Sequence, residues 1–233
     1  MQYKNIVKGT FIERLNRFVA KVEINNSVQI VHVKNTGRCR ELLLPLATVY
    51  LEYVDDSNRK TKYDLIAVEK VKANGDVLLI NMDSQIPNAA ALEYLKSSKL
   101  FSPKAKYKRE VTYKNSRFDI FIDDADIGRK AFVEVKGVTL ENDGIAMFPD
   151  APTERGVKHL NELASSIDDG FEAYVFFVIQ MKEVVSFKPN DLMHEKFGKA
   201  LRYAAQKGVK ILAMDCIVKD NYIKVDKPVD VIL

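Results

Sequence analysis

Hydrophobic and polar residues follow two different patterns along this chain, one in each part. In residues 1–83, five short apolar runs are separated by turn-forming residues and predict strands at 18–24, 28–33, 49–54, 63–68 and 77–80. Asn25-Asn26 predicts a hairpin turn between the first two runs. Five short strands joined by polar turns predict a small barrel, and their number matches the oligonucleotide-binding (OB) fold.

From about residue 105 the pattern changes to strands that alternate with amphipathic helices. Apolar runs predict strands at 107–113, 117–122, 131–138, 173–179 and 209–217, and apolar stripes at helical spacing predict helices at 153–167 and 191–206. A shorter helix over 88–95, with Asn88 as its cap, connects the two parts. We therefore expect an α+β protein of two domains: an OB-like barrel in residues 1–83 and an α/β domain with a mixed sheet in residues 84–233.

Two acids and a lysine interrupt the apolar runs of the second part. Asp119 lies in the run 117–122, and Glu134 and Lys136 lie two apart in the run 131–138, on one face of the expected strand. Carboxylate oxygens are suitable ligands for Mg²⁺ or Mn²⁺, and the backbone carbonyl of Val135 can complete the coordination shell of such an ion. An ion held there would activate water beside a phosphodiester, and Lys136 would contact that water or the phosphate. We interpret Asp119, Glu134 and Lys136 as candidate catalytic residues, and Asp119, Glu134 and Val135 as candidate metal ligands.

The alternative is an outward-facing acid and lysine on an edge strand, with Asp119 paired to a nearby arginine. The segment 148–159 favours the functional interpretation, because two prolines fix a loop before a helix that follows the strand of Glu134. Arg155 and His159 are one helical turn apart and share a face, beside Lys158. We interpret this helix start as a phosphate contact; the alternative is a capped helix with surface charges.

The net charge of +4 is mild, but the basic residues are clustered. Clusters brought together by folding would form a phosphate-binding surface, whereas the alternative is a set of solvated faces. Phe11 and Phe18 lie beside two of the arginines and would stack on bases if exposed, although each alone is more typical of a core. The candidate nucleic-acid-binding residues are Arg14, Arg17, Arg38, Arg40, Arg117, Arg155, Lys158 and His159.

Other functional classes leave no sequence signature here. No apolar run approaches the roughly 20 residues that span a bilayer, and the first residues lack the apolar core of a signal peptide. We therefore expect a cytoplasmic protein. Cys39 and Cys216 lie far apart and match no zinc spacing, so we expect both to be reduced structural thiols. Phosphate loops, dinucleotide fingerprints and nucleophile elbows are absent from the sequence.

Several runs of the chain together carry a resemblance to a known family, namely Arg14–Ala20, Val31–Arg38, Glu41–Pro45, Ser116–Asp119, Glu134–Leu140, Phe148–Gly156 and Lys158–Leu160. On these runs the chain resembles, over nearly its whole length, the sugar fermentation stimulation protein A (SfsA) family. Two positions depart from the family pattern: Lys34 replaces a usual proline, and Cys39 replaces a frequent methionine.

The resemblance implies an N-terminal OB barrel and a C-terminal domain similar to PD-(D/E)XK nucleases, whose acid, acid and lysine fall on Asp119, Glu134 and Lys136. Such nucleases often add an upstream acid, for which Glu93 and Glu110 are both candidates. The resemblance also implies DNA binding without strong sequence preference and a regulatory role in sugar, especially maltose, metabolism.

Two functions stay open at this point. One is a Mg²⁺- or Mn²⁺-dependent nuclease acting on DNA or RNA, which the intact acid, acid and lysine set favours. The other is a non-enzymatic DNA-binding regulator built on a nuclease scaffold. The sequence decides neither DNA against RNA, nor single against double strand, nor the oligomeric state.

Overall fold

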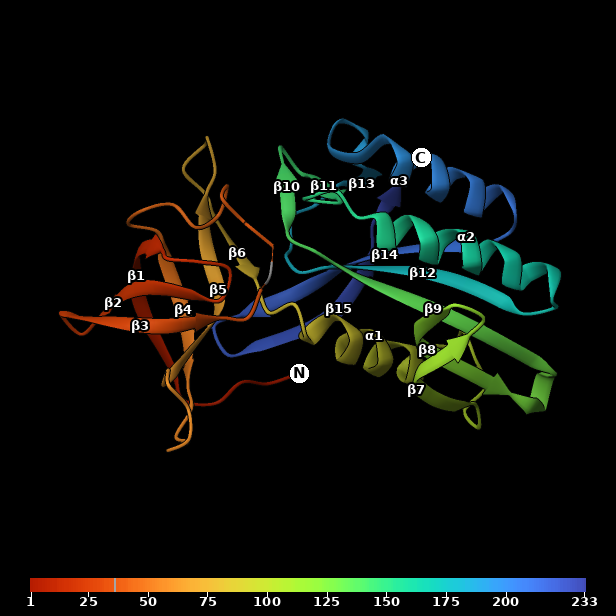
Figure 1. Ribbon diagram of the computed structural model, residues 1–233, viewed down its shortest axis with the longest axis horizontal. Coiled ribbons are helices and arrows are strands. Elements are labelled where there is room, and N and C mark those ends of the chain that lie inside the picture. The colour runs from red at the N-terminus through yellow and green to blue at the C-terminus, as the bar shows by residue number, and fades with distance from the viewer. Residues whose placement is uncertain (36) are drawn as a thin grey trace.

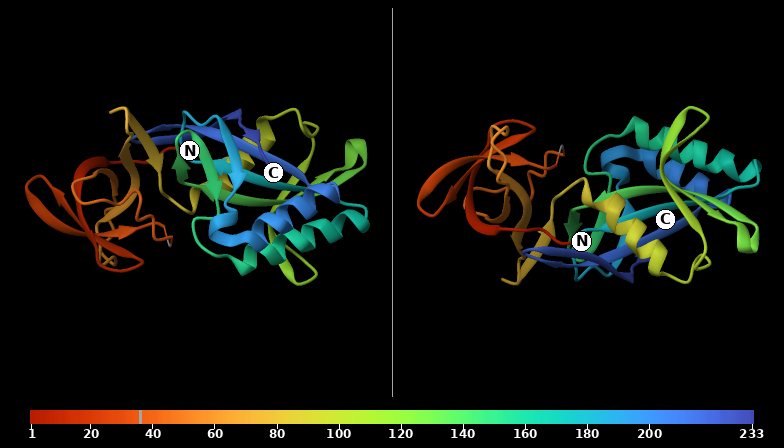
Figure 2. Two further views of the ribbon diagram at one scale, coloured as in Figure 1. Left: turned by 90° about the horizontal axis from the view of Figure 1, so that it is seen from above. Right: turned by 90° about the horizontal axis from the view of Figure 1, so that it is seen from below.

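The computed structural model describes residues 1–35 and 37–233, which form two lobes (Figure 1). Figure 2 shows the same two lobes from above and below, with the smaller lobe again standing to one side. The strands of the smaller lobe are β1 (Ile6–Arg14), β2 (Val19–Ile24), β3 (Ser27–Val33), β4 (Thr48–Tyr53), β5 (Tyr63–Val71) and β6 (Val77–Asn81).

The smaller lobe is a closed five-stranded barrel, as predicted. Its strands follow the order β3-β2-β1-β4-β5, and pairing of β3 with β5 closes the ring, while β6 extends the sheet beyond β5. The strands that make up the barrel differ from the prediction in two respects. Strand β1 was not expected, and the run at 77–80 forms β6, which lies outside the ring. Gly9 explains the omission, because it occupies a core position between Val7 and Phe11 and so breaks the apolar alternation.

Close packing requires the glycine at that position. A Cβ on Gly9 would lie 2.6 Å from Cγ1 of Val22 and 2.9 Å from the carbonyl oxygen of Glu23. Strand β1 pairs with β2 on one side and β4 on the other, so it lies centrally in the barrel wall. The barrel core is filled by buried aliphatic residues from all of the strands, among them Val22, Val31, Val49, Leu51 and Leu65.

The larger lobe is built on a mixed six-stranded sheet in the order β15-β14-β12-β9-β8-β7, in which β9, β12 and β14 run parallel and the others antiparallel. Helices α2 and α3 cover one face and α1 the other (Figure 1). The elements are α1 (Ile86–Ser97), β7 (Lys106–Tyr113), β8 (Ser116–Asp124), η1 (Ala125–Ile127), β9 (Arg129–Val138), α2 (Glu154–Asp168), β12 (Glu172–Ile179), α3 (Asp191–Gln206), β14 (Lys210–Lys219) and β15 (Tyr222–Pro228).

These elements confirm the predicted α/β domain with a mixed sheet. The predicted crossover from β9 through α2 to β12 joins parallel strands, as expected. Strand β15 and a small second sheet were not predicted. The strands of the second sheet have only two to four residues, which is too short to show a hydrophobic period. The second sheet contains β10 (Leu140–Asn142), β11 (Ile145–Phe148), β13 (Ser186–Pro189) and β16 (Asp230–Val231).

Helix α1 begins earlier than predicted. Gln85 is its N-cap and Pro87 stands in its first turn, where a missing N–H does no harm. Asn88 therefore lies inside the helix, and its side chain is free to reach another element. Within the described residues, none of the helices is both long and apolar enough to cross a membrane.

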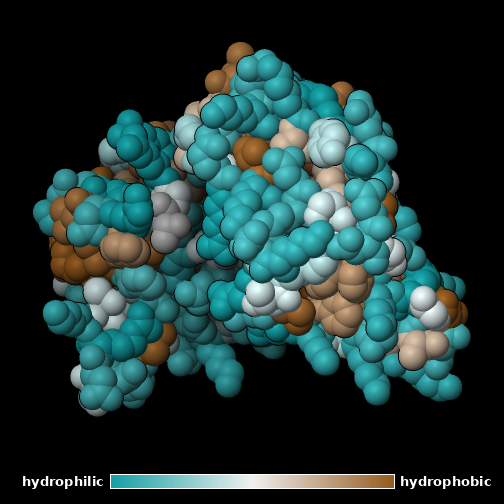
Figure 3. All heavy atoms as spheres, turned by 45° about the vertical axis from the view of Figure 1, so that its right-hand side comes forward, coloured by the Kyte–Doolittle hydropathy of each residue, from teal (hydrophilic) through white to brown (hydrophobic). Residues whose placement is uncertain are grey.

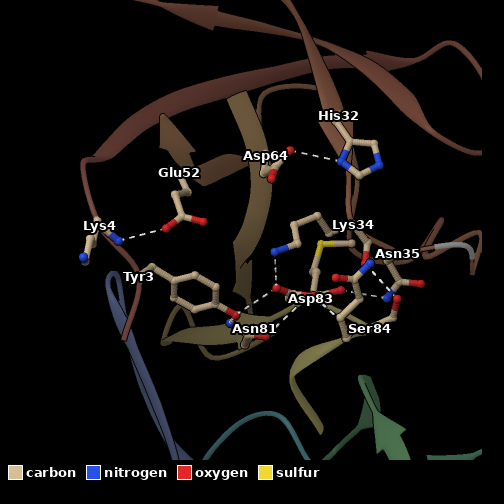
Figure 4. Close-up of polar contacts among 12 residues, drawn as sticks. Tyr3, Lys4, His32, Lys34, Asn35, Glu52, Asp64, Asn81, Asp83 and Ser84 are labelled. Atoms are coloured by element: carbon tan, nitrogen blue, oxygen red, sulfur yellow. Dashed lines mark hydrogen bonds and ion pairs between the residues drawn. The ribbon is translucent and has the colours of Figure 1, made fainter. Parts of the chain in front are cut away.

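A buried polar network joins the two lobes at Asp83, just after β6 (Figure 4). The fully buried Asp83 carboxylate lies 2.8 Å from Nζ of Lys34 and accepts a hydrogen bond from the Tyr3 hydroxyl at 3.3 Å. Burial and the Asp83 charge raise the pKa of Tyr3, which keeps its hydroxyl a donor. From the end of β12, Nε2 of Gln180 donates to the side-chain oxygen of Asn81 and to the backbone carbonyls of Asn81 and Asp83.

The expected boundary between residues 83 and 84 falls inside this network, and the first residues of the chain cross it. Tyr3 donates its backbone N–H to Asn221, and Gln2 forms a β-bridge with Tyr222 of the larger lobe. A second connection lies away from Asp83, where Nζ of Lys70 on β5 is 2.6 Å from Oε2 of the buried Glu141. The described residues thus connect the lobes at more than one place.

Candidate functional site

Strands β8 and β9 bring Asp119 and Glu134 to neighbouring positions. Their antiparallel ladder ends at the pair Ile120–Val133, and the next position in register would pair Asp119 with Glu134. In place of a continued ladder, Oδ2 of Asp119 accepts the backbone N–H of Val135 at 2.8 Å. Its Oδ1 accepts the side-chain amide of Asn88 on α1, also at 2.8 Å.

Glu134 is the most buried acid of the predicted set, with 3% of its side chain exposed. Its Oε1 accepts hydrogen bonds from Nζ of Lys136 at 2.5 Å and from Nδ1 of His159 at 2.6 Å. Its Oε2 is buried and has no hydrogen-bond partner among the described residues. Buried carboxylate oxygens without a donor are rare in folded proteins, and many of those that occur contact a bound ion or water.

His159 holds Glu134 in place instead of contacting nucleic acid, which corrects the prediction made for it. Helix α2 carries its ring into the core beside Phe118, and only 5% of the residue is exposed. Arg155, one turn earlier, places its Nε 3.4 Å from Nε2 of His159. Nδ1 of the ring thus faces Glu134 and Nε2 faces Arg155, so the ring is held between these two side chains.

The two carboxyl groups are shifted in opposite directions. Burial and the neighbouring charge of Glu134 raise the pKa of Asp119. Burial also acts to raise the pKa of Glu134, but the hydrogen bond from His159 and the charge of Lys136 outweigh it and hold that pKa below its usual value. The negative charge of Glu134 is therefore stabilised by its surroundings, whereas that of Asp119 is disfavoured. A nearby cation would favour the charged form of Asp119 more than that of Glu134.

The donor set fits a hard divalent ion. Among the described residues, no group of three or more His, Cys, Asp or Glu side chains gathers closely enough to hold a metal by itself. Mg²⁺ does not require such a group, since it binds through one or two carboxylates and keeps several waters. The N–H and C=O of a strand residue point to the same side, so the carbonyl of Val135 lies on the edge where Asp119 has replaced the ladder.

Neither candidate upstream acid contacts Asp119. Glu93 lies on α1 with its Oε2 3.5 Å from the chain's amino group, and Glu110 pairs with Arg117 at 3.4 Å. Asn88 is the α1 residue that reaches Asp119, a role that no pattern in the sequence indicates.

The other predicted basic residues of the larger lobe surround the acids on the surface. Arg117 precedes Asp119 by two residues on β8 and is exposed. Lys158 is exposed on α2, where its Nζ donates to the carbonyl of Asn115 at 2.6 Å, and Arg155 is exposed one turn away.

The predicted arginines of the barrel gather around a cavity of about 380 Å³ that Arg14, Arg17, Arg38 and Arg40 line together with Gly37. Arg14 has a structural role there. Its guanidinium donates five hydrogen bonds, which uses every N–H it has, so none is left for a ligand phosphate. The accepting carbonyls belong to Asn16, Arg17, Asn35, Gly37 and Arg38.

The remaining three arginines of the cavity are available to a ligand. Arg17, Arg38 and Arg40 are exposed, and none of them forms an ion pair with another described residue. The two neighbouring aromatic residues differ in exposure. Phe11 lies in the core with 2% of its surface exposed, whereas Phe18 lies on the surface with 54% exposed. Figure 3 shows exposed hydrophobic residues gathered on the barrel lobe at the left, among hydrophilic ones.

Together these features define a two-domain protein in which an OB barrel precedes a mixed α/β lobe with an acid, acid and lysine set around the buried Glu134. Family models match both parts: the SfsA N-terminal OB domain over residues 12–80, and the sugar fermentation stimulation protein RE domain over residues 85–222. The chain belongs to the SfsA family.

Whole-length relatives agree with this assignment. A sugar fermentation stimulation protein homolog of Clostridium beijerinckii is 53% identical over 233 residues, which cover 100% of both chains. The homolog of Ruminiclostridium cellulolyticum is 52% identical over 231 residues, 99% of each chain. Among solved structures, SfsA of Pyrococcus furiosus in complex with Ca²⁺ matches with a TM-score of 0.86 and 27% identity, covering 100% of this chain and 98% of that one.

Replacing Asp119 by Asn tests the electrostatic account of the site. Asn keeps the shape and can still accept from Val135, but it removes a half-buried charge beside Glu134. We expect the metal-free variant to be more stable than the wild type at pH 7 by roughly 0.5–2 kcal/mol, measured by urea unfolding in chelator.

The stability advantage of this variant should depend on pH, because the pKa of Asp119 is raised. The wild-type penalty is fully present above the folded-state pKa and disappears as the pH falls below the ordinary value of 3.8, so the variant's advantage must shrink in acid. An advantage that is independent of pH, or a less stable variant at pH 7, would contradict the account.

Proposed function

We propose that this protein is a metal-dependent nuclease that hydrolyses phosphodiester bonds of DNA or RNA. The observation that carries the proposal is the buried carboxylate of Glu134, whose Oε2 has no partner among the described residues while its Oε1 accepts from Lys136. A structural role alone would not require a buried Glu134 and a half-buried Asp119 at adjacent positions of a sheet, since two neighbouring carboxylates withdrawn from water oppose folding.

Each residue has a distinct role in this proposal. Asp119, Glu134 and the carbonyl of Val135 would hold Mg²⁺ or Mn²⁺. A bound ion would polarise a phosphate oxygen and lower the pKa of the attacking water. Lys136 would stabilise the negative charge that develops on the phosphate, and His159 keeps Glu134 in the orientation that the site needs.

Basic side chains on both lobes support a nucleic-acid substrate. Arg117, Arg155 and Lys158 are exposed around the acids, where they would contact the backbone of a bound strand. The Ca²⁺ complex of the Pyrococcus furiosus relative supports a divalent ion in this family. Ca²⁺, Mg²⁺ and Mn²⁺ share a preference for oxygen ligands of the kind that Asp119 and Glu134 supply.

Cleavage assays test the nuclease directly. Labelled single- and double-stranded DNA and RNA would be incubated with the protein in Mn²⁺, in Mg²⁺ or in chelator. We expect cleavage that requires metal and that falls by at least about 100-fold in Lys136→Ala, because the variant loses transition-state charge stabilisation.

The matched control for this assay is Lys130→Ala. Lys130 is an exposed lysine on the same strand, β9, and its removal should leave cleavage unchanged. Intact substrates under every condition, or equal cleavage by Lys136→Ala and wild type, would refute the nuclease proposal.

A second candidate function is a DNA-binding regulator of sugar metabolism that performs no catalysis. The arginine cavity favours it, because that cavity lies on the barrel and is built without any contribution from Asp119 or Glu134. The family's name, sugar fermentation stimulation protein, agrees with such a role.

Salt dependence tests the arginine cavity under either function. We expect affinity for DNA, measured in chelator, to fall with salt and to survive Glu134→Gln. Arg38→Ala and Arg40→Ala should each reduce the slope of log affinity against log salt by about 0.7 for a single strand or 0.9 for a duplex. Lys219→Ala, an exposed lysine at the end of β14, is the control. An affinity that does not change with salt would exclude the cavity as a phosphate site.

A further inference from the structure

A second cavity, of about 180 Å³, lies between the two lobes, and both of them contribute to its wall. Asn35 and Gly37 form the barrel side, whereas Asp150 and Gln180 belong to the larger lobe. Asp119, Glu134 and Lys136 are not among the wall residues, so this cavity is separate from the acid, acid and lysine set. Small-molecule sites occur preferentially at such interfaces between domains.

Gln180 presents an unpaired oxygen to this cavity, although only 1% of the residue is exposed. Its Nε2 donates to three oxygens of Asn81 and Asp83, and because an oxygen can only accept here, the amide nitrogen must face them. Its Oε1 therefore faces Gly137, which also lines the cavity, and a Cβ on that glycine would lie 2.6 Å away from it. Among the described residues, none donates a hydrogen bond to Oε1, so water or a ligand must supply the donor.

Asp150 supplies a second acceptor, and it is the one charged residue of the wall among those described. Its Oδ2 reaches the barrel loop, where it lies 2.7 Å from the position that a Cβ on Gly37 would take. The carboxylate forms no hydrogen bond and no ion pair with another described residue. An ionised carboxylate only accepts hydrogen bonds, so a ligand must meet it with an O–H or N–H group.

We propose that this cavity binds a small, neutral, polyhydroxylated molecule of the size of a monosaccharide. Hydroxyl groups supply the donors that Gln180 and Asp150 lack. The described part of the wall contains no Lys, Arg or His, which disfavours a phosphate or another anion. Arg14 donates to the backbone carbonyls of Asn35 and Gly37, so its positive charge lies behind the barrel side of the wall and disfavours a cation.

The apolar part of the wall and the volume agree with a ligand of this class. Leu140, Met147 and Phe148 are half-buried wall residues, and they offer apolar surface to the C–H groups of a sugar or polyol. Drug-sized ligands occupy pockets of about 300–1,000 Å³, so a cavity of about 180 Å³ suits a smaller molecule. A ligand held here contacts both lobes. The inference goes beyond the proposed nuclease and does not depend on it.

Saturation-transfer NMR tests the cavity on the full-length chain, titrated with D-glucose, D-ribose or glycerol in chelator. We expect at least one of them to bind saturably, with a dissociation constant of about 1 mM or lower. Asp150→Ala should weaken this binding by at least about tenfold, because it removes a charged acceptor. The matched control is Asp55→Ala, which removes an exposed carboxylate of the barrel and should leave the affinity unchanged.

Ser84→Trp provides a second test, because Ser84 lines the cavity and is exposed, so a large side chain there fills the space without entering a core. We expect it to abolish the binding that Ser57→Trp, a control on an exposed turn, retains. If Ser84→Trp unfolds at a lower temperature than the wild type, Asp150→Ala decides by itself.

Several results would overturn the inference: no saturable binding of any of the three compounds, equal binding by Asp150→Ala and wild type, or saturable binding of inorganic phosphate or spermidine in their place. Sugars also stabilise proteins through exclusion from the surface, but that effect does not saturate and is the same in every variant. Absence of cleavage with polyol binding intact would refute only the nuclease.

Discussion

A buried carboxylate, that of Glu134, next to the half-buried carboxylate of Asp119 is the constraint on which the arrangement of the larger lobe depends. Asp119 and Glu134 sit at the point where the β8–β9 ladder ends, and the elements around them supply compensating groups. Asn88 comes from α1, the Val135 N–H from β9 and the His159 ring from α2. Only Oε2 of Glu134 has no hydrogen-bond partner among the described residues of this cluster. This unpaired carboxylate oxygen makes the cluster a candidate cation site.

The relation between the two lobes follows from a second set of buried polar contacts. Asp83 and Gln180 connect the end of β6 with the end of β12, and Gln180 also borders Gly137, the residue after Lys136. The same side chain thus fixes the barrel and lines a cavity of about 180 Å³ to which both lobes contribute. Because Arg14 holds the loop around Gly37 through backbone carbonyls, the arginine cavity has a defined position relative to that space.

The sequence predicted those parts of the structure whose signal is local. Long periodic runs located β7, β8, β9, α2, β12 and α3, and two charges at strand spacing located Glu134 and Lys136. Strand β1 was missed because Gly9 stands where the alternation needs an apolar residue. His159 was predicted to bind nucleic acid, but its side chain contacts Glu134. The apolar stripe of a helix does not reveal which strand the helix packs against, so this contact could not be predicted. Asn88, Asp83 and Arg14 act through partners more than 20 residues away, which no local pattern can show.

Metal binding to the intact chain tests the central claim most directly, because it examines the site without requiring a substrate. Titration calorimetry with Mn²⁺ would compare the wild type with Glu134→Gln, which keeps the size of the side chain and removes its charge. We expect a single saturable site in the wild type and an affinity at least about tenfold lower in the variant. Equal binding of Mn²⁺ by the two proteins would contradict the claim that Glu134 holds the ion.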